Sequence, residues 1–179
     1  MSGKRVVLIT GAARSGKSRY AEWRAKQIGG RLLYVATAEA NDEEMAHRIK
    51  EHRRHRGKEW LTVEESVQLT NALLNNRGRV DCAVVDCLTL WISNLILLRD
   101  EEYAAEKVEQ LIEKLPQLDF DIIFVTNEVG WAVVPDNPLA RKFRDLSGTT
   151  NQRIAHAADE VILMVAGIPM IVKQGGQCS

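Results

Sequence analysis

The chain has 179 residues, of which 27% are charged and 45% are hydrophobic, and 24 basic and 24 acidic side chains give a formal net charge of zero. This composition excludes an intrinsically disordered chain, and the length suits one domain with a sizeable core. Because a neutral chain has no overall attraction to polyanions, we expect neither nucleic acid nor a membrane as a partner.

The three cysteines, Cys82, Cys87 and Cys178, form neither a CxxC pair nor an even set. This pattern disfavours structural disulfides and a zinc site, and it fits a reducing compartment. The apolar run after the basic N-terminus is too short for a signal peptide, and no later run is long enough to span a membrane. We therefore expect a cytoplasmic protein.

Apolar runs of strand length alternate with stretches of helical periodicity along the chain. This alternation predicts a single α/β domain over residues 1–173, with a mostly parallel central sheet and helices on both faces. Residues 174–179, rich in glycine and polar side chains, are predicted to form a flexible tail. The expected strands are residues 5–10, 31–37, 82–86, 121–126, 160–166 and 170–173, and the expected helices are residues 19–28, 42–54, 104–115 and 139–157.

After the first predicted strand, GAARSGKS matches the G-x-x-x-x-G-K-[ST] pattern of nucleotide phosphate loops, and a predicted helix follows it. Two glycines let the backbone turn its N–H groups toward phosphates at the positive end of that helix. The lysine would reach the terminal phosphates and the last serine would bind Mg²⁺. The alternative is a glycine-rich turn without a ligand. The predicted phosphate site comprises Gly11, Ala12, Ala13, Arg14, Ser15, Gly16, Lys17 and Ser18.

The predicted helix over residues 42–54 carries a histidine on its inward face. Met45, Ile49, His52 and Arg56 fall within a stripe roughly 60° wide, and His47 lies on nearly the opposite side. The inward His52 has three interpretations: a satisfied core residue, a metal ligand, or a nucleophile toward a phosphate held by the flanking arginines. A metal site is disfavoured because His52 and His55 lack a nearby set of Cys or carboxylate partners with metal-ligand spacing.

Two later strands also end in polar side chains. Asp86 ends the strand over residues 82–86, as expected for a carboxylate that contacts Mg²⁺ or a nucleotide, although such a residue is also a common cap. Asn127 and Glu128 follow the strand over residues 121–126, and a simple turn fits them nearly as well. Since ligands bind beyond the carboxyl ends of parallel strands, these side chains are expected to face one crevice.

Several blocks of the sequence, in order, resemble the bifunctional adenosylcobinamide kinase / adenosylcobinamide-phosphate guanylyltransferase family of cobalamin assembly. The resemblance covers nearly the whole chain, and its RI-x-x-H…W-x-T-x-E and NEVG…VP-x-N-x-LAR-x-FRD…NQ patterns are far more distinctive than a phosphate loop. The blocks are GAARSGKS (11–18), YVATA (34–38), DEEMAHRIKEHRRHRGKEWLTVEE (42–65), VVDCLTLWISNL (84–95) and TNEVGWAVVPDNPLARKFRDLSGTTNQRIAHAADEVILMVAGIP (126–169).

The resemblance implies a RecA-like P-loop NTPase fold, a homotrimer, and the use of ATP, GTP and Mg²⁺. It also implies two reactions: a nucleoside triphosphate phosphorylates adenosylcobinamide, and GTP then converts the phosphate to adenosylcobinamide-GDP with release of pyrophosphate. In this family the second reaction passes through a guanylyl-histidine, and the matching residue is His52. Glu51 stands where some relatives have a second histidine.

Carried over residue by residue, the resemblance places the triphosphate on Gly11–Ser18, with Lys17 and His52 as catalytic residues and with Ser18 and Asp86 as metal ligands. The further nucleotide contacts that it implies are Ala36, Thr37, Ala38, Arg53, Arg54, His55, Arg56, Glu64 and Asp86.

Three other functions remain open from the residues alone. One is a one-step P-loop kinase with a structural His52, and another is a nucleotide-regulated binding module. The third is a RecA-like ATPase or nucleic-acid binder that contacts a nucleic-acid backbone through residues 53–58. The zero net charge and the absence of an aromatic stacking platform in that run disfavour this third function. The polar side of residues 137–153 is either a solvated helix face, part of the corrinoid site or a subunit interface.

Overall fold

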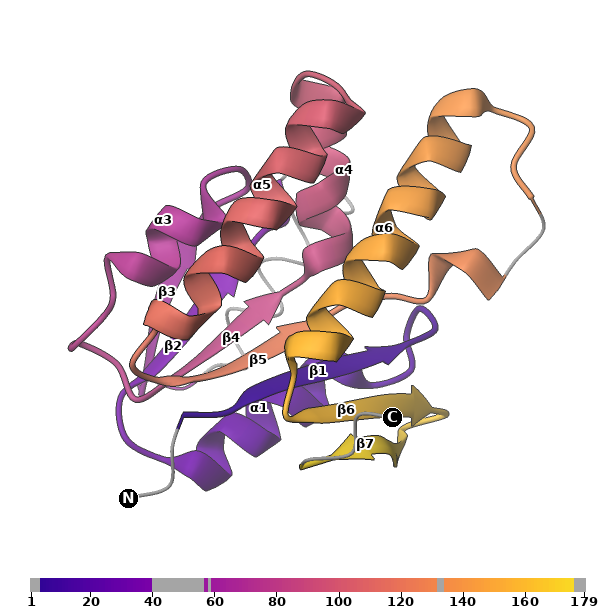
Figure 1. Cartoon of the computed structure of the whole chain (residues 1–179). Helices are drawn as coiled ribbons and strands as arrows, with labels where there is room; N and C mark the ends of the chain where they lie inside the picture. The colour runs from indigo at the N-terminus through magenta and orange to yellow at the C-terminus, as the bar shows by residue number, and fades with distance from the viewer. Residues whose placement is uncertain (1–3, 40–56, 58, 132–133, 176–179) are drawn as a thin grey trace.

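The computed structural model describes residues 4–39, 57, 59–131 and 134–175. Its centre is a seven-stranded sheet with the order β3-β2-β4-β5-β1-β6-β7 (Figure 1). Strands β1 to β6 all run parallel to one another, and only β7 is antiparallel among the described strands, which confirms the predicted mostly parallel sheet. The strands are β1 (Val6–Gly11), β2 (Leu32–Ala36), β3 (Trp60–Glu64), β4 (Cys82–Asp86), β5 (Asp121–Val125), β6 (Glu160–Val165) and β7 (Ile168–Gln174).

Helices cover both faces of the sheet in the described part of the chain. Helix α1 (Lys17–Ile28) lies on one face, and the other face carries α3 (Leu69–Leu74), α4 (Leu88–Leu98), α5 (Glu101–Lys114) and α6 (Pro138–Ala157) (Figure 1). Two short 3₁₀ helices, η1 (Leu115–Gln117) and η2 (Val129–Trp131), complete these elements. Within the described residues, no helix has both the length and the apolar character that a membrane crossing requires.

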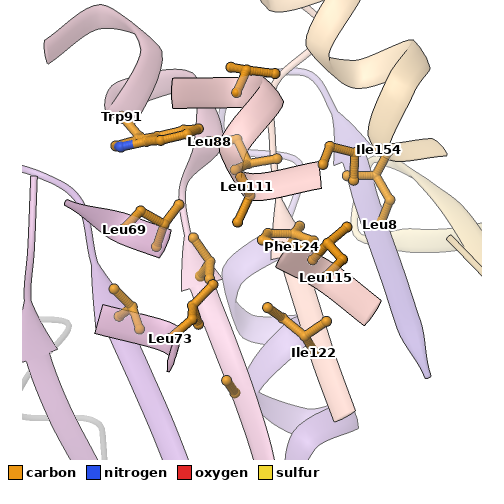
Figure 2. Packing of buried hydrophobic residues seen from close by; sticks show 14 of the residues in the cluster. Leu8, Leu69, Leu73, Leu88, Trp91, Leu111, Leu115, Ile122, Phe124 and Ile154 are labelled. Atoms are coloured by element: carbon orange, nitrogen blue, oxygen red, sulfur yellow. The ribbon is translucent and has the colours of Figure 1, made fainter. Parts of the chain in front are cut away.

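The helices and the sheet enclose two hydrophobic cores. On the α1 face, Ala21 and Ala25 pack against Val7, Ile9 and their neighbours in the sheet. On the opposite face, strand residues such as Leu8, Ile122 and Phe124 meet helix residues such as Leu111 and Ile154 (Figure 2). Burying a side chain of this size stabilises the fold by about 1.5–3 kcal/mol, so the two cores hold the carboxyl ends of the strands in fixed register.

Among the described elements, α4, β3 and α3 are not predicted by the periodicity of the sequence. Helix α4 has the sequence LTLWISNLILL and is buried against the sheet, α5 and α6, so it lacks the polar face that marks an amphipathic helix. Strand β3 lies at the edge of the sheet, and α3 has only six residues. Short or uniformly apolar segments give weak periodic signals, which explains why these elements were missed.

The strand order brings the ends of distant segments together. Strand β5 lies between β1, which leads into the glycine-rich loop, and β4, which ends at Asp86. In a parallel sheet all carboxyl ends meet at one edge, where ligands of open α/β folds bind. The candidate site is therefore built along that edge.

Candidate functional site

The backbone of residues 11–16 forms the cradle that the sequence predicts. Gly11 ends β1 with a φ of 144°, and a Cβ atom at this position would lie 2.5 Å from the carbonyl oxygen of Met164 in β6. Gly16 caps α1 in the left-handed conformation, with a φ of 93°, and its cap has no side-chain hydrogen bond. The first N–H groups of α1 are consequently available to an anionic ligand.

A buried hydroxyl in the cradle also lacks a partner. Ser15 is only 7% exposed, and its Oγ atom makes no hydrogen bond to any described residue. Leaving a polar group in this state costs about 1–3 kcal/mol, so an acceptor supplied by a ligand would remove the cost. A phosphate oxygen beside the first turn of α1 is such an acceptor.

Lys17 is buried against the loop that precedes it. Its side chain is 7% exposed, and Nζ donates a hydrogen bond of 2.6 Å to the carbonyl oxygen of Ala12. Burial lowers the pKa of Lys17 from its usual value, while the nearby Cys87 and Asp86 oppose that change. The ammonium group is thus hydrogen-bonded to the loop itself. The negative charge of nucleotide phosphates bound there would stabilise its protonated form.

Three predicted contact residues share one edge of the sheet. In the register of the strands, Ala36 of β2 pairs with Glu64 of β3 on one side and with Asp86 of β4 on the other. Glu64 is exposed, and Asp86 is half-buried. Residues 50 positions apart in the sequence are therefore neighbours here, and they place two carboxylates on the same side of the cradle.

The position of Asp86 is controlled by β2. The hydroxyl group of Tyr34 donates a hydrogen bond of 2.5 Å to Oδ2 of Asp86. Thr37 holds the next peptide: its N–H donates to the Asp86 carbonyl oxygen at 3.1 Å, and its hydroxyl oxygen lies 2.7 Å from both the N–H and the carbonyl oxygen of Cys87. The carbonyl oxygen of Thr37 accepts from Asn94 at 2.8 Å. Thr37 thus acts as a scaffold for Asp86, a role that the sequence did not indicate.

A buried polar network joins the end of β5 to the cradle. Thr10 donates a hydrogen bond of 2.5 Å to the carboxylate of Glu128, whose own N–H donates to the carbonyl oxygen of Gly11 at 3.2 Å. From α6, Asn151 donates to the Asn127 carbonyl oxygen at 3.2 Å and to Glu128 at 3.4 Å. Glu128 thus lies beside the phosphate loop, as the position of TNEVG after a strand suggested. The buried Asn151 holds Asn127 and Glu128 in place through these hydrogen bonds.

The chemistry of these groups fits Mg²⁺. Mg²⁺ prefers oxygen ligands and is commonly held by one or two carboxylates together with substrate phosphates. Ser18 follows Lys17 in the first turn of α1, and Asp86 is close enough to Lys17 to raise the pKa of its ammonium group. The Asp86 carboxylate accepts its hydrogen bond from Tyr34 through Oδ2. A hydroxyl and a carboxylate are the kinds of protein ligand that a nucleotide-bound Mg²⁺ uses.

His52 and the four residues after it, Arg53, Arg54, His55 and Arg56, lie outside the described residues. The cradle over Gly11–Ser18 and the edge formed by Ala36, Thr37, Ala38, Glu64 and Asp86 are described, and the structure brings them to the same end of the sheet.

Sequence reasoning overlooked the residues that support this site. Tyr34 and Thr10 lie within predicted strands, where an apolar environment was expected, and Asn151 lies on a predicted amphipathic helix. Their partners are 52, 118 and 24 residues away along the chain. One signal could have identified Tyr34 and Thr10: each is a polar side chain in a strand whose carboxyl end faces the expected ligand-binding edge of the sheet.

Comparisons with solved structures identify the fold. The chain is similar to a KaiC-like protein from the hyperthermophilic archaeon Pyrococcus horikoshii, with a TM-score of 0.53 and 16% identity over 95% of this chain and 79% of the other. It is also similar to an ATPase from a bacterial type III secretion system, with a TM-score of 0.61 and 12% identity over 90% of this chain and 51% of the other. The fold is that of a P-loop NTPase, as predicted.

Curated relatives match over almost their full lengths. Bifunctional adenosylcobalamin biosynthesis protein CobP of Pseudomonas aeruginosa is 45% identical, covering 93% of this chain and 96% of the relative. The proteins named CobU of Salmonella typhimurium and Escherichia coli are 39% and 36% identical, each covering 94% of this chain and 99% of the relative. The sequence model of the cobinamide kinase / cobinamide phosphate guanyltransferase family matches residues 7–172. This chain therefore belongs to the cobinamide kinase / cobinamide phosphate guanyltransferase family.

Proposed function

We propose that this chain catalyses both reactions named by its family. In the first, a nucleoside triphosphate phosphorylates the hydroxyl group of adenosylcobinamide. In the second, GMP from GTP is joined to that phosphate, giving adenosylcobinamide-GDP and pyrophosphate. The observation that carries the proposal is the shared end of the sheet. There, a phosphate cradle whose buried Ser15 hydroxyl has no hydrogen-bond partner among the described residues lies at the same end as Asp86 and Glu64.

In the phosphorylation step, the cradle and Lys17 hold the phosphates of the donor. The N–H groups at the start of α1 and the lysine ammonium stabilise the charge that spreads over the transferred group. Ser18 and Asp86 would hold Mg²⁺, which would neutralise charge on the phosphates. The substrate oxygen forms a bond to the terminal phosphorus, the bond to the leaving nucleoside diphosphate breaks, and the hydroxyl proton goes to a base at the edge of the sheet.

In the guanylyl transfer step, His52 is the proposed nucleophile. Its neutral ring nitrogen attacks the α-phosphorus of GTP, so that a P–N bond forms and the bond to pyrophosphate breaks. An oxygen of the substrate phosphate then attacks the same phosphorus, and the P–N bond breaks. Support comes from the sequence, which places His52 on the inward stripe of its predicted helix with arginines on both sides. The proposed contacts of the guanine nucleotide are Ala36–Ala38, Arg53, Arg54, His55, Arg56 and Glu64.

The assembly and location of the protein form a further part of the proposal. The family resemblance implies a homotrimer, and strand β7 offers a candidate contact because Ile168, Met170, Ile171 and Val172 are 52–65% exposed along this edge. The buried free thiols of Cys82 and Cys87 are consistent with a reducing cytoplasm.

A product assay tests the two-step scheme. Wild-type protein, supplied with adenosylcobinamide, ATP, GTP and Mg²⁺, should form the GDP derivative. His52→Ala should stop at the phosphate, because phosphoryl transfer from the P-loop does not need the histidine. His47→Ala is the matched control and should form both products, because His47 lies on the opposite side of the predicted helix. Lys17→Ala should form neither. Formation of the GDP derivative by His52→Ala would disprove the covalent route, and a one-step kinase would yield only the phosphate in wild type.

A further inference from the structure

A network of buried polar side chains surrounds the carboxyl end of β5, the strand between β1 and β4 (Figure 1). Its members are Thr10 of β1, Thr89 of α4, Thr126 after β5 and Asn151 of α6, and each is at most 8% exposed. The Thr126 hydroxyl donates to Asn151 at 2.8 Å and lies 3.2 Å from the Thr89 hydroxyl. Because burying polar groups costs free energy unless each is paired, such a network is expected where it holds a functional group in position.

The network holds the carboxylate of Glu128 through one of its two oxygen atoms. Oε1 accepts hydrogen bonds from Thr10 at 2.5 Å and from Asn151 at 3.4 Å. The N–H group of Glu128 donates to the carbonyl oxygen of Gly11 at 3.2 Å, which ties the residue to the start of the cradle. Among the described residues, Oε2 has no hydrogen-bond or ion-pair partner, and the side chain is only half-buried. One oxygen thus fixes the carboxylate, and the other is left for contact with a ligand.

The strand order places Glu128 nearer to the cradle than the other carboxylates of the site. Glu128 follows β5, which adjoins β1, whereas Asp86 ends the next strand, β4, and Glu64 ends β3 at the edge of the sheet. Asp86 also accepts a hydrogen bond from Tyr34 and is a proposed metal ligand. Glu128 is therefore the carboxylate best placed to meet an acceptor group at the end of a phosphate chain held in the cradle.

The described residues beyond Glu128 leave room for a large acceptor. Helix η2 begins at the next residue, and Trp131 at its end is 69% exposed. Gly130 is exposed as well, and a Cβ atom there would meet no atom within 4 Å. An exposed aromatic ring beside a few fixed polar groups suits a large substrate that presents one reactive hydroxyl group.

We propose that Glu128 is the general base of the phosphorylation step. Its Oε2 atom accepts the proton of the substrate hydroxyl while the substrate oxygen forms a bond to the terminal phosphorus. The bond from that phosphorus to the leaving nucleoside diphosphate breaks, and its electron pair stays on the diphosphate. The proton then passes to water, which restores the carboxylate. The assignment rests on the proposed kinase activity.

The two proposed reactions differ in their need for such a base. The acceptor in phosphorylation is a hydroxyl group, whose proton must be removed. The acceptor in guanylyl transfer is an oxygen of a phosphate, which is already ionised near neutral pH because its second pKa is about 6. A base that serves the hydroxyl group should matter for the first reaction alone, whereas a residue that only supports the cradle would matter for both.

Glu128→Gln tests this difference. The amide oxygen of glutamine can still accept the hydrogen bonds from Thr10 and Asn151, but the amide does not take up a proton near neutral pH. Phosphorylation is measured with adenosylcobinamide and ATP, and guanylyl transfer is measured separately with GTP and preformed adenosylcobinamide phosphate. We expect the kcat of phosphorylation to fall about 100-fold. The rate of guanylyl transfer and the calorimetric Kd of Mg²⁺-bound β,γ-imido-ATP should stay within about twofold of wild type.

Glu113→Gln, at an exposed position on α5, is the matched control and should leave both rates unchanged. The assignment is overturned if Glu128→Gln phosphorylates at the wild-type rate. It is also overturned if the variant loses nucleotide affinity, or loses both reactions to the same extent, since either result indicates a supporting role. A wild type that forms no phosphate would instead disprove the proposed kinase activity.

Discussion

At the scale of single residues, the carboxylate of Asp86 is positioned by a side chain from another strand. Tyr34 is 1% exposed, and its ring meets that of Trp60 edge to face, with the ring centres 5.9 Å apart. A ring held this firmly fixes the hydroxyl that donates to Asp86 at 2.5 Å. Groups that orient a metal ligand commonly change metal affinity by 10–100-fold when they are removed. Tyr34 is thus a positioning residue for the proposed Mg²⁺ site.

Tyr34→Phe should therefore weaken metal binding more than it weakens folding. We expect the apparent affinity for Mn²⁺, measured by electron paramagnetic resonance in the presence of a nucleotide, to fall by about tenfold. Tyr20→Phe is the control, because Tyr20 stacks on Trp23 in α1 and should leave metal affinity unchanged. A variant with a lower melting temperature but wild-type metal affinity would show that the hydrogen bond is only structural.

The phosphate cradle could be predicted from residues alone, whereas the support for Asp86 could not. Gly11, Gly16, Lys17 and Ser18 form a local pattern whose chemistry depends on neighbours within eight residues. Tyr34 and Thr37 contact residues 52 and 50 positions away, and their roles follow from the order β2-β4 in the sheet. Strand order is set by long-range packing and leaves no trace in the spacing of a single sequence.

At the scale of elements, helices with a clear local pattern were predicted, and helices whose burial depends on long-range packing were not. Helix α5 has charged residues on one face, and Asp100 caps it by accepting a hydrogen bond from the N–H of Tyr103, so periodicity and capping agree. Helix α4 lacks that contrast because Trp91, Ile92 and Leu95 are fully buried while the few polar residues of the helix serve contacts such as Asn94 to Thr37. An element buried on most sides therefore carries the weakest helical signal.

The amino ends of β2 and β4 are joined by an exposed ion pair whose strength should depend on pH. Asp81 accepts hydrogen bonds from the N–H of Arg31 at 2.7 Å and from its guanidinium group at 3.1 Å. These bonds lower the pKa of Asp81 from 3.8 to about 2. Because the folded pKa is the lower one, the pair stabilises the fold above about pH 4, and this stabilisation is lost as the pH falls toward 2.

Asp81→Asn should accordingly melt at a lower temperature than wild type at pH 7, with a difference that shrinks between pH 4 and pH 2. Thermal unfolding followed by circular dichroism at a series of pH values measures this difference. Asp136→Asn, at an exposed position outside this pair, should show no such convergence. A gap between wild type and Asp81→Asn that stays constant down to pH 2 would contradict the assignment.

At the scale of the whole molecule, β7 is an edge strand whose apolar side chains the other described residues leave exposed. Its side chains include Ile168, Met170, Ile171 and Val172, each more than half exposed. Exposed apolar edge strands favour association, and the proposed homotrimer would bury this one.

Replacing Ile168 and Val172 with lysine should therefore reduce the molecular mass in solution from that of the oligomer to that of the monomer. Light scattering coupled to size-exclusion chromatography measures the change. Trp23→Lys is the control, since Trp23 is also about half exposed but belongs to α1 and not to this strand. If the double variant keeps the wild-type mass, the subunit contact lies elsewhere.

The family of this chain carries out two phosphorus transfers, and we propose that in this chain the second transfer passes through His52. Protein incubated with Mg²⁺ and GTP labelled at the α-phosphorus should retain the label after denaturation, release it in acid and keep it in base, as a P–N bond does. His52→Ala should retain none. Normal labelling of His52→Ala, or a wild type that never becomes labelled, would contradict the account.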